Sequence, residues 1–105
     1  MNVIYIAGKY RARTIFGVIR NIWMARKAAQ ILWEHGWCVV CPHLNTALFR
    51  NMSFAGKQIQ YLEGGLEMLK HCQAIYMLKG YEDSEGALIE LELAQKLGLE
   101  VIYEF

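Results

Sequence analysis

The sequence predicts an α/β fold in which a four-stranded parallel sheet lies between two layers of helices, as in a shortened flavodoxin-like or Rossmann-like domain. Short apolar runs alternate with longer segments of helical periodicity, in the order βαβαβαβ. The apolar runs are continuous, which is typical of parallel strands that are covered on both faces. Right-handed crossovers between such strands favour the strand order 2-1-3-4. Residues 1–105 are therefore expected to form a single three-layer domain.

The first half of the chain contains two predicted strands and one predicted helix. Residues 2–7 form the first strand, with a continuous apolar run over residues 3–6, and a glycine ends it. A helix is predicted from residue 16 or 19 to residue 35, because apolar residues recur there at helical spacing and a glycine follows. Residues 37–41 form the second strand, which is followed by a proline and a predicted loop.

The second half repeats this alternation after residues 47–57, which are predicted to form a loop that can cover a site as a lid. Two adjacent glycines, Gly64 and Gly65, lie in the middle of the next helix, where each costs about 1 kcal/mol relative to alanine. The pair indicates a kink or a close approach of another group to the helix backbone. The predicted elements are a helix over 57–71, a strand over 74–78, a helix over 87–97 and a strand over 100–103.

Composition and charge exclude several classes of protein. With 55% hydrophobic and 20% charged residues, the chain can build a core and is not expected to be disordered. Its formal net charge of +1 gives no overall attraction to nucleic acid or to an anionic membrane. No apolar run reaches the length of a membrane span, and charged residues follow the first strand too closely for a secretory signal. We therefore expect a cytoplasmic protein, and the many apolar residues favour a homodimer or larger homo-oligomer.

Three cysteines, Cys38, Cys41 and Cys72, indicate the redox setting of the protein. Their odd number and the lack of a secretory signal favour a reducing cytosol. Cys38 and Cys41 have the C-x-x-C spacing of zinc and redox motifs, but they fall within a predicted strand, where their side chains point to opposite faces. Burial as small apolar residues is favoured over metal or redox chemistry, and we expect neither a metal nor a cofactor.

The junction between the third strand and the third helix, residues 80–90, carries the first candidate site. It lies at the carboxyl end of a strand, where α/β sheets bind ligands, and Ser84 is placed to cap the helix. Glu90 borders the helix face that is expected to pack on the sheet. A carboxylate held beside apolar surface is a candidate nucleophile or acid–base group. The alternative is a boundary glutamate whose carboxylate reaches water.

Two further candidate sites follow the first and second strands. A loop that begins at Gly8 carries Lys9, Arg11 and Arg13, a pattern that suits phosphate binding, although a solvated basic loop explains it equally well. This loop is neither a Walker loop nor a G-x-G-x-x-G fingerprint. After the second strand, His43 is a candidate proton donor or base contact, and a hydrogen bond within the loop is the alternative.

Several of these residues together resemble the nucleoside 2-deoxyribosyltransferase-like superfamily, in particular a small branch from phages and bacteria. The likeness covers nearly the whole chain and is carried mainly by two motifs. One is Tyr-x-Ala-Gly, from Tyr5 to Gly8, and the other is Ser-x-Gly-x-x-x-Glu, from Ser84 to Glu90. The other matching residues are Asn21, Cys41, Pro42, His43, Ala87 and Ala94.

The resemblance implies a mechanism and a set of site residues. A glutamate at the position of Glu90 is the nucleophile that attacks C1′ of a deoxyribose and displaces the base, as in a retaining glycosidase, and Tyr5 orients it. Transfer of the sugar to a second base makes a transferase, and transfer to water makes a hydrolase. Clustered cations favour a nucleotide over a nucleoside as the small-molecule partner. With the loop residues above, the substrate-binding candidates are Gly8, Lys9, Arg11, Arg13, His43, Asn45, Ser84 and Gly86.

The sequence also departs from the superfamily pattern. Lys9 replaces a frequent proline, Gly65 stands where an aspartate of the second helix is common, and Gln73 replaces another frequent aspartate. Glu63 and His43 are the candidate substitutes for the missing acid. Three functions therefore remain open: an N-glycosidic bond hydrolase or deoxyribosyltransferase, a nucleotide-binding protein without catalysis, and a structural or interaction protein.

Overall fold

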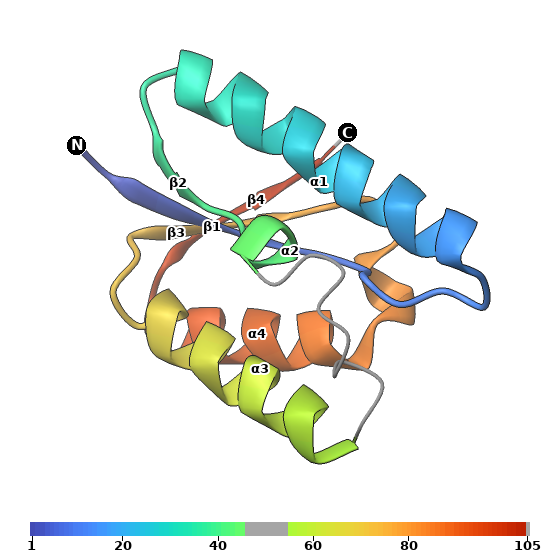
Figure 1. Ribbon diagram of the computed structural model, residues 1–105. Coiled ribbons are helices and arrows are strands. Elements are labelled where there is room, and N and C mark those ends of the chain that lie inside the picture. The colour runs from blue at the N-terminus through green and yellow to red at the C-terminus, as the bar shows by residue number, and fades with distance from the viewer. Residues whose placement is uncertain (46–54, 105) are drawn as a thin grey trace.

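A parallel sheet with helices on both faces organises the part of the chain that the structure describes (Figure 1). The computed structural model describes residues 1–45 and 55–104, with side chains from residue 60 onward in the second range, so most of the predicted lid lies outside it. Neighbouring strands are parallel and follow the order β2-β1-β3-β4, which confirms the predicted fold class and strand order. The strands are β1 (Val3–Ala7), β2 (Cys38–Val40), β3 (Ala74–Met77) and β4 (Glu100–Tyr103).

The central strand β1 holds the two halves of the core together. It lies between β2 and β3, where Tyr5 is in register with Val40 on one side and Ile75 on the other. Successive side chains of a strand point to opposite faces of the sheet. Ile4 and Ile6 accordingly pack in one core cluster, whereas Tyr5 packs in the other.

Helices cover the two faces unequally. One long helix, α1 (Ile15–Glu34), lies over the face of Ile4 and Ile6, and its buried residues are mostly alanines that allow a close approach to the sheet. Two helices, α3 (Ala55–Leu69) and α4 (Glu85–Lys96), lie side by side over the opposite face (Figure 1). The buried phenol ring of Tyr5 is therefore on the α3–α4 side of the sheet.

Two hydroxyl side chains cap the helices that follow strand ends. The Oγ1 of Thr14 accepts a hydrogen bond from the backbone N–H of Gly17 at 3.2 Å, which fixes the start of α1. The Oγ of Ser84 accepts one from the backbone N–H of Ala87 at 3.2 Å and fixes the start of α4, as predicted. Because the caps lie one residue before each helix, α1 and α4 begin slightly earlier than the apolar periodicity indicated.

Two short helices stand where the sequence predicted loops. One is α2 (Pro42–Asn45), directly after β2, and it contains His43. The other is the 3₁₀ helix η2 (Tyr81–Asp83), which follows Gly80 in the left-handed conformation with φ of 88°. The loop prediction was wrong for both segments, because a single helical turn is too short to show a hydrophobic period.

The cysteines are divided between the two faces of the sheet. Cys41 is buried in the α1-side cluster, and Cys72 is buried in the α3–α4-side cluster. Burial raises the pKa of Cys41 to about 11, so its thiol stays protonated at neutral pH. No helix among the described residues has both the length and the apolar character to cross a membrane.

Candidate active site

The hydroxyl of Tyr5 donates a hydrogen bond to Oε2 of Glu90 across the α3–α4 side of the sheet. Tyr5 comes from the central strand and is fully buried, and Glu90 comes from α4 and is half-buried. Glu90 reaches this position because Ala87 and Ala94, on the same helix, are buried against the sheet and bring that side of α4 close to it. The helical spacing therefore predicted its place correctly: Glu90 lies at the border of the packed face.

Gly65 of α3 lies against both Tyr5 and Glu90. A Cβ atom at Gly65 would lie 2.5 Å from the hydroxyl oxygen of Tyr5 and 3.3 Å from Oε2 of Glu90. A Cβ at Gly64 would meet nothing within 4 Å. The close approach predicted from the glycine pair is therefore confirmed at Gly65, and the approaching groups are the two candidate catalytic side chains.

Burial changes the acidity of both groups. It raises the pKa of Glu90 to about 7, against the opposing effect of the hydrogen bond from Tyr5. The pKa of Tyr5 is raised as well, first by burial and then by the neighbouring carboxylate. Tyr5 therefore keeps its proton and donates it in the hydrogen bond, while Glu90 changes charge near neutral pH. A carboxylate poised in this way is able to act as a nucleophile or an acid–base group.

The His43 side chain supports the first loop instead of facing Glu90. Its Nε2 lies 3.1 Å from the carbonyl oxygen of Lys9, and its ring centroid lies 5.7 Å from that of Tyr10. Because a carbonyl only accepts, Nε2 must carry the proton, so Nδ1 is the unprotonated nitrogen. Burial lowers the pKa of His43, which keeps the ring neutral. Nearby, the Nδ2 of Asn45 donates to Sδ of Met68 at 3.7 Å and links α2 to α3.

The predicted loop cations are exposed, and the loop that carries them is anchored to α1. The side-chain Nδ2 of Asn21 donates to the carbonyl oxygens of Tyr10 at 3.1 Å and Arg11 at 3.4 Å. Arg11 and Arg13 extend into solvent beyond this anchor. The loop is therefore held against α1 at the carboxyl edge of the sheet.

Two residues named from the superfamily departures lie away from the pair of Tyr5 and Glu90. Glu63 is exposed on α3. Gln73 accepts a hydrogen bond through Oε1 from the backbone N–H of Val3 at 2.7 Å, at the amino-terminal edge of the sheet. Gln73 thus joins β1 to β3 and takes no part in the site at the opposite edge. Among the described residues, no three histidine, cysteine, aspartate or glutamate side chains converge as metal ligands would.

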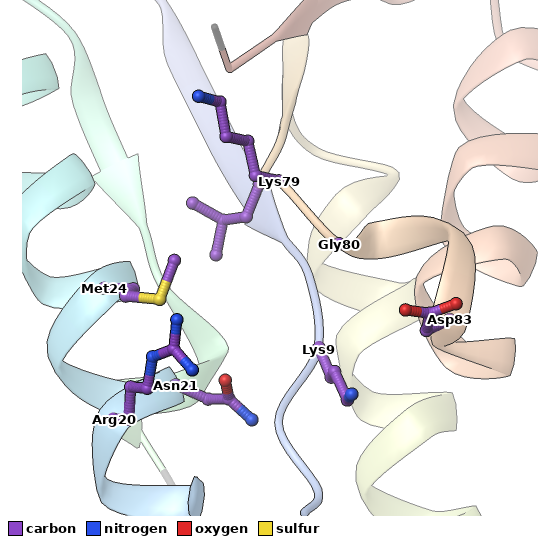
Figure 2. Close-up of a pocket in the computed structure, with 8 residues that line it drawn as sticks. Lys9, Arg20, Asn21, Met24, Lys79, Gly80 and Asp83 are labelled. Carbon is purple, nitrogen blue, oxygen red and sulfur yellow. The ribbon is translucent and has the colours of Figure 1, made fainter.

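A cavity of about 170 Å³ lies at the carboxyl edge of the sheet on the α1 side (Figure 2). The sequence pointed to Lys9 and Asn21 among its residues but missed Arg20 and Lys79. The available signals were modest: Arg20 precedes Asn21 on the helix, and Lys79 follows the third strand. The lining residues are Lys9, Arg20, Asn21, Met24, Leu78, Lys79, Gly80 and Asp83.

Comparison with known proteins agrees with this architecture. The family model of DUF4406, described as a domain of unknown function, matches residues 2–103. That family is grouped in one clan with the deoxyribosyltransferases, which confirms the resemblance drawn from the sequence motifs. A solved 2-deoxyribosyltransferase from the psychrotolerant bacterium Bacillus psychrosaccharolyticus has the same fold, with a TM-score of 0.70 and 21% identity over 96% of this chain and 70% of that one. Curated protein sequences give no match.

Proposed function

Because the chain belongs to the DUF4406 family and has the fold of a 2-deoxyribosyltransferase, we propose that it acts on the N-glycosidic bond of a deoxynucleoside or deoxynucleotide. The observation that supports this proposal is the hydrogen bond from Tyr5 to Glu90 in a partly buried position. A surface glutamate would have no such partner and no reason for a pKa of about 7. Glu90 is the nucleophile in this proposal, and Tyr5 holds and orients it.

The proposed reaction proceeds through a glycosyl–enzyme intermediate. Tyr5 engages Oε2, so Oε1 of Glu90 is the oxygen that attacks C1′ of the sugar. The bond from C1′ to the base nitrogen breaks through an oxocarbenium-like transition state, and its electron pair leaves with the base. Water or a second base then attacks C1′, the proton that it loses passes to the nitrogen of the departed base, and the bond from C1′ to Oε1 breaks to release the carboxylate.

The substrate phosphate is proposed to lie between the first loop and the start of α4. Ser84 uses its oxygen as a cap acceptor, which leaves its hydroxyl hydrogen to donate to an anion. Gly86 lies in the same first turn, where backbone N–H groups favour negative charge. Lys9, with Arg11 and Arg13 beyond it, supplies positive charge from the loop.

A second candidate function is nucleotide binding without cleavage, and Gly65 is the observation that favours it. The leaving base needs a proton, and an acidic side chain at this position of α3 would lie beside Tyr5 and Glu90. Glycine supplies none. His43 supports the loop and Glu63 is exposed, so neither substitute proposed from the sequence faces the pair.

The test is incubation of the purified protein with deoxynucleosides and deoxynucleoside monophosphates, followed by chromatography for free base. We expect one substrate class to release base, and Glu90→Gln to abolish the release while the protein stays folded. Glu92→Gln is the matched control, because Glu92 lies on the same helix in an exposed ion pair with Lys96 at 3.3 Å. Stoichiometric binding without any product would favour the second function. Base release that survives in Glu90→Gln would contradict the assignment of the nucleophile.

A further inference from the structure

The cavity on the α1 side is separate from the pair of Tyr5 and Glu90. Leu78 lines it and belongs to the α1-side core, whereas Tyr5 packs on the other face of the sheet. A Cβ atom at Gly8 would lie 2.7 Å from Cβ of Leu78, so the ends of β1 and β3 are in close contact there. The two strand ends therefore stand between the cavity and the proposed nucleophile.

Positive charge predominates around this cavity. Three cations, Lys9, Arg20 and Lys79, and one carboxylate, Asp83, line it, which leaves an excess of two positive charges. In Figure 2, Arg20 extends from α1, and Lys9 lies at the end of β1 toward Asp83. Lys79 lies at the far rim, with its side chain directed away from the other two cations. The ion pairs within the described residues involve none of these four side chains. Uncompensated charges of one sign attract an anion to the space that they share.

The walls of the cavity are fixed by hydrogen bonds of their own. Asn21 holds the first loop through the carbonyl oxygens of Tyr10 and Arg11. On the other side, the backbone N–H of Lys79 donates to Oε1 of Glu104 at 2.8 Å, and Gly80 follows in the left-handed conformation. The third wall is the helix α1 itself. A site whose backbone is already ordered loses little conformational entropy when a ligand binds.

We propose that this cavity binds the phosphate group of a phosphorylated sugar or other organic phosphate ester, as a second anion site that shares Lys9 with the one proposed at the start of α4 and is marked by Arg20, Asn21 and Lys79. A phosphate monoester carries a charge close to −2 at neutral pH, which matches the excess of charge at the cavity. Arg20 offers the planar guanidinium that suits phosphate oxygens. Asp83 is placed to accept a hydrogen bond from a hydroxyl group of the ester. The volume of about 170 Å³ equals that of roughly five or six water molecules, enough for the phosphate and part of its alcohol. This proposal rests on the cavity and not on the reaction at Glu90.

Backbone amide NMR shifts of the isotope-labelled protein test the location. The probes are inorganic phosphate and 2-deoxyribose 5-phosphate, each titrated alone. We expect the largest shifts at Arg20, Asn21 and Gly80, which belong to the cavity alone, and tighter binding of the ester than of inorganic phosphate. Shifts confined to Ser84 and Ala87 would overturn the proposal and place the phosphate at the start of α4. An ester that binds no more tightly than inorganic phosphate would overturn the assignment to an organic phosphate.

Matched substitutions on one helix test the residues. Arg20→Gln is expected to weaken phosphate binding about tenfold, the usual effect of losing a charge-assisted hydrogen bond. Arg26→Gln is the control, because its guanidinium carbon lies 4.9 Å from the ring centroid of Trp23, outside the cavity. Asp83→Asn is expected to strengthen binding of inorganic phosphate and to reduce the preference for the ester. Equal weakening by Arg20→Gln and Arg26→Gln would show a general charge effect and overturn the proposal, whether or not the protein releases base.

Discussion

The hydroxyl of Tyr5 and the carboxylate of Glu90 form a hydrogen bond that joins the central strand to the helix covering it. Apolar side chains surround the contact, and the backbone of Gly65 approaches it from α3. The contact is therefore a polar group inside one half of the core, where it is costly unless both partners are present. Both the activity and the stability of the protein are therefore expected to change when Glu90 ionises.

Activity is expected to increase with pH as Glu90 ionises. Only the carboxylate form is a nucleophile, and burial raises the pKa of Glu90 to about 7, so kcat/KM for base release should rise with a midpoint near that value. The hydrogen bond from Tyr5 lowers this pKa, so Tyr5→Phe should move the midpoint to higher pH. Base-release rates of the natural sequence and of Tyr5→Phe, measured between about pH 5 and pH 9, give both midpoints. A pH-independent profile, or a shift to lower pH in Tyr5→Phe, would contradict it.

Stability is expected to show the opposite dependence on pH. The pKa of Glu90 is raised in the folded state from 4.5 to about 7, so the folded protein binds more protons in that window. The stabilising effect of the protonated Glu90 carboxyl group is full below about pH 4.5 and is lost as the pH rises through 7. Glu90→Gln carries no charge and should be more stable than the natural sequence at pH 8, by about 2 kcal/mol.

Chemical denaturation of both proteins at pH 5 and pH 8 measures this effect, with Glu92→Gln as the control. Glu92→Gln removes only an exposed ion pair, so its free energy of unfolding should change by less than about 1 kcal/mol at either pH. An equal response of the two variants would show that Glu90 is no more buried than an ordinary surface carboxylate.

Local sequence patterns were sufficient for the fold and for the position of Glu90. Continuous apolar runs define the strands of this structure because both faces of the sheet are covered. Helical spacing placed Glu90 beside the packed face of α4. The glycine pair of α3 indicated that another group lies close to the backbone of that helix. These features arise within one element, where the residues that matter are a few positions apart.

Contacts between distant segments could not be predicted in the same way. Tyr5 and Glu90 are 85 residues apart, and their pairing was inferred only from the superfamily resemblance. The cavity beside Arg20 and Lys79 is assembled from three segments, so no single window of sequence contains its charge pattern. The supporting position of His43 also depends on a contact with Lys9, 34 residues away.

Gly65→Ala is expected to disturb the site, and Gly64→Ala is its matched control. Alanine at either position gains about 1 kcal/mol of helix propensity. At Gly65 the new Cβ would lie 2.5 Å from the hydroxyl oxygen of Tyr5, and such overpacking costs about 1–3 kcal/mol. Gly64→Ala should therefore be more stable than the natural sequence, and Gly65→Ala should be less stable than Gly64→Ala.

Free energies of unfolding from denaturant titrations compare the two glycine variants. Base release gives an independent readout, since displacement of Tyr5 should reduce kcat in Gly65→Ala and leave Gly64→Ala unchanged. Equal stability and equal activity of both variants would mean that the close approach of Gly65 has no part in the site.

Ser84→Ala and Thr14→Ala separate helix capping from substrate binding. Each hydroxyl oxygen accepts a hydrogen bond from a backbone N–H three residues later at 3.2 Å, so each loss should cost about 1 kcal/mol of stability. Only Ser84 lies at the start of α4, where the substrate phosphate is proposed to bind. Ser84→Ala should therefore raise the KM for a deoxynucleoside monophosphate about tenfold and affect the matching nucleoside little. A similar change in KM for Thr14→Ala, or for the nucleoside, would show that Ser84 acts through the helix alone and would remove it from the substrate site.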